Sequence, residues 1–265
     1  MAPVGIIGDG AIGRLIASRL RCQDWPVLLA GRQHPKNTPV CLWLICTKSY
    51  QVAEAVATLD TQTPLVLLSN GLGPHQQLAL RPNPLYLGTT TYGARRQGSN
   101  VELTGRGHCD YGHYAGHSRH LPLVHTVLNA ALPPARQHLV VMPALLRKLA
   151  INAVINPLTA RDGVSNGALL AEHYRQEIQT LVDQMQPVLY GLGLPDDNAT
   201  LSAQLYRVAA NTAANHSSML QDITNGRKTE IDSITGYLCQ QAQQQHLPVP
   251  AHQALLEIIK DLANE

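Results

Sequence analysis

The first half of the chain alternates short apolar runs with segments rich in glycine, proline and polar residues. The runs occupy positions 4–7, 27–30, 40–46 and 65–68, and a further run that includes three threonines occupies 85–92. Short apolar runs without polar alternation are typical of strands buried on both faces of a parallel sheet. Helical periodicity appears between them, at positions 14–20 and 52–56. This order predicts an α/β domain.

The second half changes to a helical pattern. Two short runs, 101–104 and 109–112, predict an antiparallel strand pair across a glycine-rich turn. A last short strand is predicted at 139–141, followed closely by Pro143. From position 144 onward the pattern is helical, with glycine and proline between the helices. We therefore predict an α/β domain at 1–142, followed by an all-α domain at 143–265.

The connection between the second and third predicted strands is unusually short. After Arg32 only seven residues, Gln33 to Pro39, precede the third predicted strand, whereas a helical crossover to a parallel neighbour needs a dozen or more. Seven extended residues span at most roughly 23–25 Å, which is just enough to return over the sheet. We expect a trimmed sheet in which strand 27–30 lies at the edge and strand 40–46 lies on the far side of the first strand.

The composition of the chain argues against several classes of protein. The chain has 265 residues, 45% of them hydrophobic and 14% charged, with a formal net charge of +2. It contains no basic run that would suggest nucleic acid and no apolar stretch of membrane-spanning length. Five cysteines, an odd number without a C-x-x-C pair, fit reduced thiols. These features predict a cytoplasmic protein that binds neither nucleic acid nor membranes.

The glycine motif after the first run predicts a dinucleotide site. Its residues are Gly8, Asp9, Gly10, Ala11, Ile12 and Gly13. The pattern G-x-G-x-x-G between a buried strand and a helix lets a diphosphate approach the backbone at the helix N-terminus. The α/β domain is therefore predicted to be Rossmann-type. A purely structural glycine turn is the alternative.

Three further residues lie where such a cofactor would bind. Arg32 follows the second strand, where an NAD-binding protein usually has an acidic residue, and an arginine there favours the 2′-phosphate of NADP(H). Lys48 and Asn70 follow the third and fourth strands, so both lie at the ligand edge of the sheet. The alternatives are a surface arginine and an ordinary Asn-Gly turn.

An apolar helix in the second half contains a polar stripe. Lys148, Asn152 and Asn156 are each four residues apart and share one helix face. A lysine in apolar surroundings can act as a proton donor, and the two amides can bind a ligand in the same groove. A solvated stripe on an amphipathic helix explains the same spacing equally well.

Two later polar segments remain ambiguous from the pattern alone. Ser218 and Asp222 are one helical turn apart, but Asn225-Gly226 interrupts the helix before Glu230. Periodicity therefore does not decide whether Ser218 and Glu230 face one site. On these grounds Glu230 is a solvated or helix-start carboxylate rather than a catalytic one, with Thr229 as a candidate helix cap. Five histidines and Cys109 between positions 108 and 125 match no zinc signature, so no metal site is expected.

With these motifs in order, the chain resembles the ketopantoate reductase (2-dehydropantoate 2-reductase) family over almost its whole length. The motifs that resemble the family are the glycine motif, Thr47-Lys48, Ser69-Asn70-Gly71, Gly88-Thr89-Thr90, Lys148-Leu149-Ala150-x-Asn152, Asn156-Pro157-Leu158-Thr159, Ser217-Ser218-Met219-Leu220-Gln221-Asp222 and Thr229-Glu230-Ile231-Asp232. The resemblance implies a Rossmann domain, a helical domain and an active site between them.

The resemblance also implies a role for individual residues. Lys148 would be the general acid, and Glu230 would hold Lys148, the substrate hydroxyl or the cofactor in place. The resemblance implies substrate binding by Asn152, Asn156, Ser218 and Asn70, and cofactor binding by the glycine motif, Arg32, Lys48, Asn70 and Glu230. Asp222 would have a supporting role at most.

The implied reaction is NADPH-dependent reduction of 2-dehydropantoate to (R)-pantoate in pantothenate and coenzyme A biosynthesis, by a monomer or homodimer. One departure is the segment after Arg32, which is shorter than in the family and would weaken NADP(H) affinity or selectivity. Two alternatives remain: a reductase of the same fold that acts on another 2-oxo acid, and a non-catalytic NADP(H) sensor. A sensor would have no use for a proton donor at Lys148.

Overall fold

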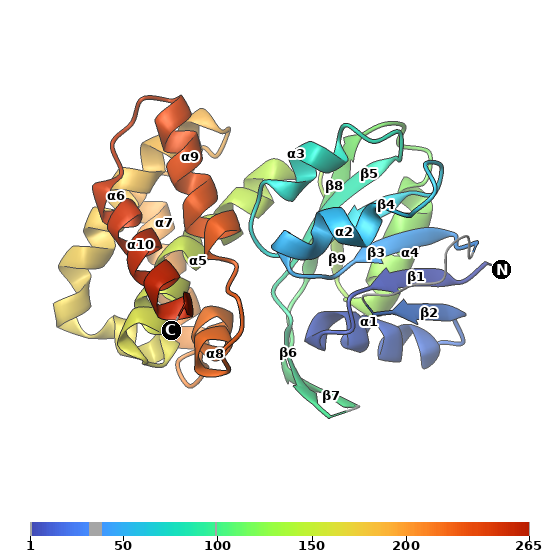
Figure 1. Ribbon diagram of the computed structural model, residues 1–265, viewed down its shortest axis with the longest axis horizontal. Coiled ribbons are helices and arrows are strands. Elements are labelled where there is room, and N and C mark those ends of the chain that lie inside the picture. The colour runs from blue at the N-terminus through green and yellow to red at the C-terminus, as the bar shows by residue number, and fades with distance from the viewer. Residues whose placement is uncertain (1, 32–38, 99, 265) are drawn as a thin grey trace. The chain divides into compact units, whose positions relative to one another are not determined.

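The chain forms two compact units, Met1–Val141 and Met142–Glu265. The computed structural model describes residues 2–31, 39–98 and 100–264. Within these residues every strand lies in the first unit, and the second unit is helical (Figure 1). This confirms the predicted order of an α/β domain followed by an all-α domain.

The first unit is built on a mostly parallel sheet with the strand order β2-β1-β3-β4-β5-β8-β9 among the described residues. The strands of this sheet are β1 (Val4–Ile7), β2 (Val27–Ala30), β3 (Leu42–Ile45), β4 (Leu65–Leu67), β5 (Leu85–Thr90), β8 (Cys109–Ala115) and β9 (Ala135–Gln137). Strands β1 to β5 are parallel, whereas β8 is antiparallel to β5 and β9 is parallel to β8.

The position of β3 agrees with the short connection that precedes it. β2 is the edge strand, and β3 pairs with the opposite side of β1, so that Ile7 lies opposite both Ala30 and Ile45. The predicted trimmed sheet is confirmed in this respect. The chain reverses its direction of progress across the sheet between β1 and β3, which is the switch point where ligands of open α/β sheets bind. Most of the connection itself, residues 32–38, lies outside the described residues.

Two predictions about the later strands were wrong. β7 (Asn100–Gly105) pairs with β6 (Gly93–Gln97) in a separate hairpin, and not with β8. The predicted strand at 139–141 is irregular, and the last strand is β9, which contains two polar residues of three. An apolar run predicts burial, but the side chain of Leu139 is 97% exposed. Periodicity could not identify β9, because three residues are too few for alternation to show.

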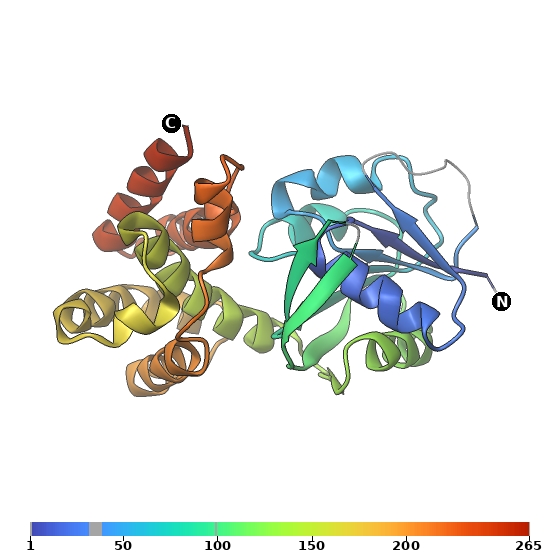
Figure 2. The same ribbon diagram turned by 90° about the horizontal axis from the view of Figure 1, so that it is seen from below.

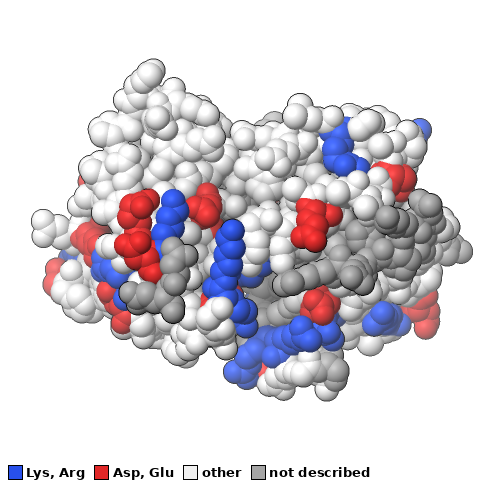
Figure 3. All heavy atoms as spheres, in the orientation of Figure 1, with Lys and Arg blue, Asp and Glu red and all other residues white. Residues whose placement is uncertain are grey.

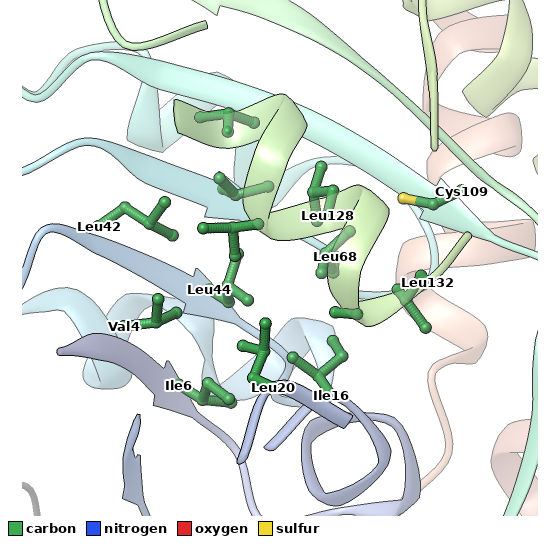
Figure 4. Packing of buried hydrophobic residues seen from close by; sticks show 14 of the residues in the cluster. Val4, Ile6, Ile16, Leu20, Leu42, Leu44, Leu68, Cys109, Leu128 and Leu132 are labelled. Carbon is green, nitrogen blue, oxygen red and sulfur yellow. The ribbon is translucent and has the colours of Figure 1, made fainter. Parts of the chain in front are cut away.

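Helices cover both faces of the sheet (Figure 2). α1 (Ala11–Arg21) and α4 (Leu121–Ala131) lie on one face, and Figure 4 shows their leucines packed against strand residues such as Val4 and Leu44. The opposite face has α2 (Val52–Val56), which follows a 3-10 turn at Ser49–Gln51 and packs against α3 (Pro74–Leu78). The chain contains no Phe, and aliphatic side chains with Tyr86 and Tyr111 fill this core.

The second unit is organised around α5 (Met142–Asp162), which contacts most of the other helices. The remaining helical segments are two 3-10 turns (Asn166–Leu170 and Glu172–Tyr174), α6 (Arg175–Gly191), α7 (Asn198–Asn211), α8 (Ser218–Thr224), a π-helical turn (Asp232–Gly236), α9 (Tyr237–Gln244) and α10 (Pro250–Asn264). The C-terminal half of α5 is buried on all sides from Ala153 to Ala160, as expected for the central helix of a bundle. No helix within the described residues is long and apolar enough to span a bilayer.

Candidate functional site

The loop between β1 and α1 requires glycine for steric reasons. Gly8 has a φ angle of +112°, and a Cβ atom on Gly13 would lie 1.9 Å from the carbonyl oxygen of Gly8. Gly10 precedes α1, and no described atom lies within 4 Å of the position that its Cβ would occupy. The space beside Gly10 is therefore open at the N-terminus of α1, where the N–H groups of a first helical turn can bind phosphate oxygens. These residues fit the diphosphate of a dinucleotide.

The neighbouring strands end beside this loop. Ile7, Ile45 and Leu67 lie in register across β1, β3 and β4, so that the residues after them lie at one edge of the sheet. Among the described residues, the hydroxyl oxygens of Thr47 and Ser69 are buried there and make no hydrogen bond. Buried hydroxyl groups without a partner are uncommon and often indicate a missing ligand or water.

Lys48 and Asn70 directly follow these two hydroxyl residues. Both side chains are half-buried. Lys48 precedes the 3-10 turn at Ser49–Gln51 in an extended conformation. The edge thus presents one cation and one amide beside the glycine loop, which are groups that bind nucleotide phosphate or ribose oxygens. Arg32, the residue predicted to bind the 2′-phosphate, lies outside the described residues.

In the second unit, α5 contains the polar stripe. Lys148 and Asn152 are half-buried, whereas Asn156 is only 6% exposed. Burial therefore increases along the stripe, and a fully solvated polar face does not account for Asn156. Pro157 follows at once inside the helix and has no N–H, so the carbonyl of Ala153 lacks its usual donor four residues later.

A buried hydrogen bond connects this end of α5 to α8. Thr159 Oγ1 lies 2.8 Å from Ser217 Oγ, and it also contacts the carbonyl oxygen of Asn156 at 3.2 Å. Ser217 is the N-cap of α8, because its hydroxyl oxygen accepts a hydrogen bond from the N–H of Leu220. The next residue, Ser218, is exposed at the first position of α8. The bond therefore holds Ser218 near the Asn156 end of the stripe.

Thr159 and Ser217 are residues whose roles the sequence pattern did not reveal. A serine directly before the apolar pair Met219-Leu220 is a recognisable N-cap signal. The partner across the fold could not be found in the same way, because Thr159 and Ser217 are 58 residues apart.

A salt bridge fixes the other end of α5. Arg147 donates to the two carboxylate oxygens of Asp196 over 2.8 and 2.7 Å, and Gln204 donates to the same carboxylate over 3.1 Å. These hydrogen bonds, first that of Arg147, lower the pKa of Asp196 below its ordinary value. Since Arg147 precedes Lys148, the salt bridge limits rotation of this turn of α5.

Glu230 lies at the beginning of the helical segment that contains the π turn. Its backbone carbonyl accepts hydrogen bonds from Ser233 and Ile234, and Thr229 Oγ1 accepts a long hydrogen bond of 3.4 Å from the N–H of Ile231. The predicted position of Glu230 at a helix start is confirmed. Thr229 as the cap is not confirmed, because the residue before the π turn is Ile231, which has no side-chain cap. The solvated alternative is wrong, because Glu230 is 5% exposed. The π turn that follows packs against α5, and π turns occur frequently at functional sites.

Asp222 belongs to the framework of α8. It is buried, and its Oδ1 accepts a hydrogen bond of 3.1 Å from Nε of Arg227. In the first unit, Asp110 lies between His108 and His138, at 3.0 and 2.7 Å. The described residues contain no group of three or more side chains that could hold a metal ion.

Comparisons with known proteins agree with this arrangement. Models of the ketopantoate reductase PanE/ApbA family match residues 33–116, and models of its C-terminal region match residues 140–263. A 2-dehydropantoate 2-reductase from Vibrio cholerae is 32% identical, over 97% of this chain and 96% of that protein. The chain belongs to the ketopantoate reductase family. The predicted family resemblance is thus confirmed.

Solved structures extend the comparison to the fold. A ketopantoate reductase of this family from Ralstonia eutropha has a TM-score of 0.87 at 21% identity, over 99% of this chain and 98% of that one. A D-mandelate dehydrogenase, solved with NADH and anilino(oxo)acetate, has a TM-score of 0.89 at 19% identity, with the same coverage. At these identities the two likenesses show the fold alone.

Proposed function

We propose that this protein reduces 2-dehydropantoate to (R)-pantoate with NADPH, a step of pantothenate and coenzyme A biosynthesis. The observation that supports it best is the stripe on α5. A lysine lies at its half-buried beginning and Asn156 at its buried end. The stripe, along which burial increases, thus combines a charged proton donor with amides that can bind the polar groups of a small acid.

In this proposal Lys148 is the general acid. When the cofactor is bound, it supplies a hydride to the keto carbon of the substrate. Negative charge then develops on the ketone oxygen, and the ammonium of Lys148 stabilises that charge and donates the proton. Glu230, buried at its helix start, orients the lysine or the hydroxyl that forms. The product is a 2-hydroxy acid.

The remaining residues bind the two ligands. Asn152, Asn156 and Ser218 bind the substrate, and the Thr159–Ser217 hydrogen bond keeps the last two near each other. Residues 1–142 serve as the NADP(H)-binding domain, with the glycine loop at the diphosphate and Lys48 and Asn70 at the strand edge. Residues 143–265 serve as the substrate and catalytic domain.

We infer NADP(H) as the cofactor from Arg32. A guanidinium at this position can form hydrogen bonds and an ion pair with the 2′-phosphate on the adenosine ribose. The open glycine loop supports dinucleotide binding in general. The short segment after Arg32 is expected to reduce the preference for NADP(H) over NAD(H).

The test is the loss of NADPH absorbance when 2-dehydropantoate is added to the purified protein, with NADH in parallel. Turnover with 2-dehydropantoate well above that with other 2-oxo acids would support the proposal. Turnover with another 2-oxo acid but not with 2-dehydropantoate would overturn the proposed substrate. NADPH binding without turnover of any 2-oxo acid would overturn catalysis and favour a sensor.

A further inference from the structure

An acidic residue occupies an unfavourable position in the glycine loop. Asp9 lies between Gly8 and Gly10, directly before the first turn of α1. A diphosphate bound at that turn would lie close to the Asp9 carboxylate, since consecutive Cα atoms are about 3.8 Å apart. Like charges at such a distance oppose binding. The loop therefore needs compensating positive charge.

Two arginines supply that charge. Arg14, on α1, donates from Nε to the backbone oxygen of Asp9 over 2.8 Å, and its Nη2 lies 3.4 Å from Asp9 Oδ2. Arg96, on strand β6, places Nη1 3.7 Å from the same carboxylate oxygen. The three side chains together have a net charge of +1. Figure 3 shows Lys and Arg side chains gathered over the β6–β7 hairpin.

The hairpin is packed so that Arg96 faces α1. Arg96 lies opposite Val101 in the strand pairing, and directly opposed residues share a face. Val101 packs against the core of the first unit together with Ala94 and Leu103, and both strands of the hairpin contact α1 (Figure 2). Arg96 is thus held at the inner face of a docked hairpin.

Arg95 provides an internal comparison. It lies opposite Glu102 on the outer face, and the two form an exposed ion pair of 2.8 Å. Within residues 2–31, 39–98 and 100–264, the guanidinium of Arg96 forms a longer ion pair than that of Arg95. Its Nε donates to the carbonyl oxygen of Gly98 over 3.0 Å, and its separation of 3.7 Å from Asp9 is too long for a hydrogen bond. The N–H groups of Nη1 and Nη2 can therefore donate hydrogen bonds to a bound anion.

We propose that Arg96 binds the diphosphate of the dinucleotide from the inner face of the β6–β7 hairpin, while Asp9 holds its guanidinium beside the glycine loop. This inference rests on the proposed function only in requiring that the protein binds a nicotinamide dinucleotide. It gives the hairpin a role in cofactor binding that its position outside the main sheet did not suggest.

The test is the dissociation constant of NADPH and of NADH, measured by fluorescence titration of the whole protein. Arg96→Gln should raise both constants about tenfold, the effect of losing one charge-assisted hydrogen bond. Arg96→Lys should restore part of the affinity, and Arg95→Gln should change it less than twofold. Thermal unfolding of each variant confirms that the fold is intact.

A second pair of variants separates direct binding from mere neutralisation of Asp9. If Arg96 contacts the diphosphate, Arg96→Gln should weaken binding about tenfold in an Asp9→Asn background as well. Loss of the effect in that background would overturn the proposal, and so would an effect on NADPH but not on NADH. If the wild-type protein binds neither nucleotide, the proposed function fails together with this inference. Normal binding by Arg96→Gln overturns the inference alone.

Discussion

Thr159 Oγ1 and Ser217 Oγ form a buried hydrogen bond of 2.8 Å that joins the middle helix of the second unit to the start of α8. It connects two segments that each contain proposed substrate ligands, Asn156 and Ser218. Neither hydroxyl is proposed to touch the substrate. Both are positioning residues, and the consequences of losing their bond can be measured separately from those of losing a ligand.

Thr159→Val should weaken substrate binding more than chemistry. Valine keeps the shape of threonine but leaves Ser217 Oγ with one partner fewer, which should lower the free energy of unfolding by about 1–3 kcal/mol. We expect the KM for 2-dehydropantoate to rise and the KM for NADPH to remain unchanged. Urea unfolding and steady-state kinetics test both effects. Thr180→Val is the control, because Thr180 is exposed and its hydroxyl donates to the carbonyl oxygen of Gln176 in the same helix. Equal effects of the two variants would contradict the prediction.

Lys148→Ala should reduce turnover by about 10²–10⁴, the usual range for loss of a general acid. The affinity for NADPH should be largely kept, because the lysine acts on the substrate oxygen. Stopped-flow turnover and fluorescence titration measure the two quantities. Turnover equal to that of the wild-type protein would exclude Lys148 as the proton donor.

Asp196→Asn should destabilise the second unit and lower turnover. Asparagine cannot accept both hydrogen bonds from the charged Arg147, and the expected loss is about 1–3 kcal/mol because Arg147 is partly exposed. The lowered pKa of Asp196 means that its contribution to the free energy of unfolding is present above the ordinary aspartate pKa and is lost as the pH falls through its lowered value. Chemical denaturation at several pH values measures the contribution.

The control for Asp196 is Glu172→Gln. Glu172 and Arg175 form an exposed ion pair of 3.0 Å on neighbouring turns, and such pairs contribute little. A change in stability within about 0.5 kcal/mol is expected. If both variants lost the same stability, burial of the Arg147–Asp196 pair would not be the cause.

Arg32→Ala should raise the KM for NADPH more than that for NADH. The guanidinium is proposed to bind the 2′-phosphate, which NADH lacks. Parallel kinetics with the two cofactors measure the difference. Equal changes would mean that Arg32 does not contact the 2′-phosphate.

His252 should make the second unit sensitive to acid. Its Nε2 donates to the carbonyl oxygen of Leu181 over 3.0 Å, whereas Nδ1 is buried without a partner among the described residues. Burial lowers the pKa of His252 from 6.5 to about 4. Between these values the unfolded chain binds a proton that the folded chain does not, so stability falls as the pH falls, by up to about 1.4 kcal/mol per pH unit.

His252→Gln tests this origin of the acid sensitivity. Glutamine retains a donor for Leu181 but does not titrate. The free energy of unfolding of the variant, measured between pH 4 and 6.5, should have a shallower slope than that of the wild-type protein. Exposed His173 is the site of the control substitution, His173→Gln, which should leave the slope unchanged. Parallel curves for wild type and His252→Gln would show that another group is responsible.

The sequence alone determined the features that depend on near neighbours. The glycine motif between β1 and α1, the edge position of β2 and the change to helices near residue 142 all follow from local pattern and chain length. The four-residue spacing of Lys148, Asn152 and Asn156 fixed their common helix face in the same way. These features can be predicted without knowing which residues pack against them.

Tertiary structure decided everything that depends on a partner far along the chain. It paired β7 with β6 rather than β8, exposed Leu139 within an apolar run and buried Glu230 at a helix start. It also brought Arg96 to Asp9 and Ser217 to Thr159. Local propensity cannot predict such contacts, because burial and pairing depend on which surfaces the whole fold brings together.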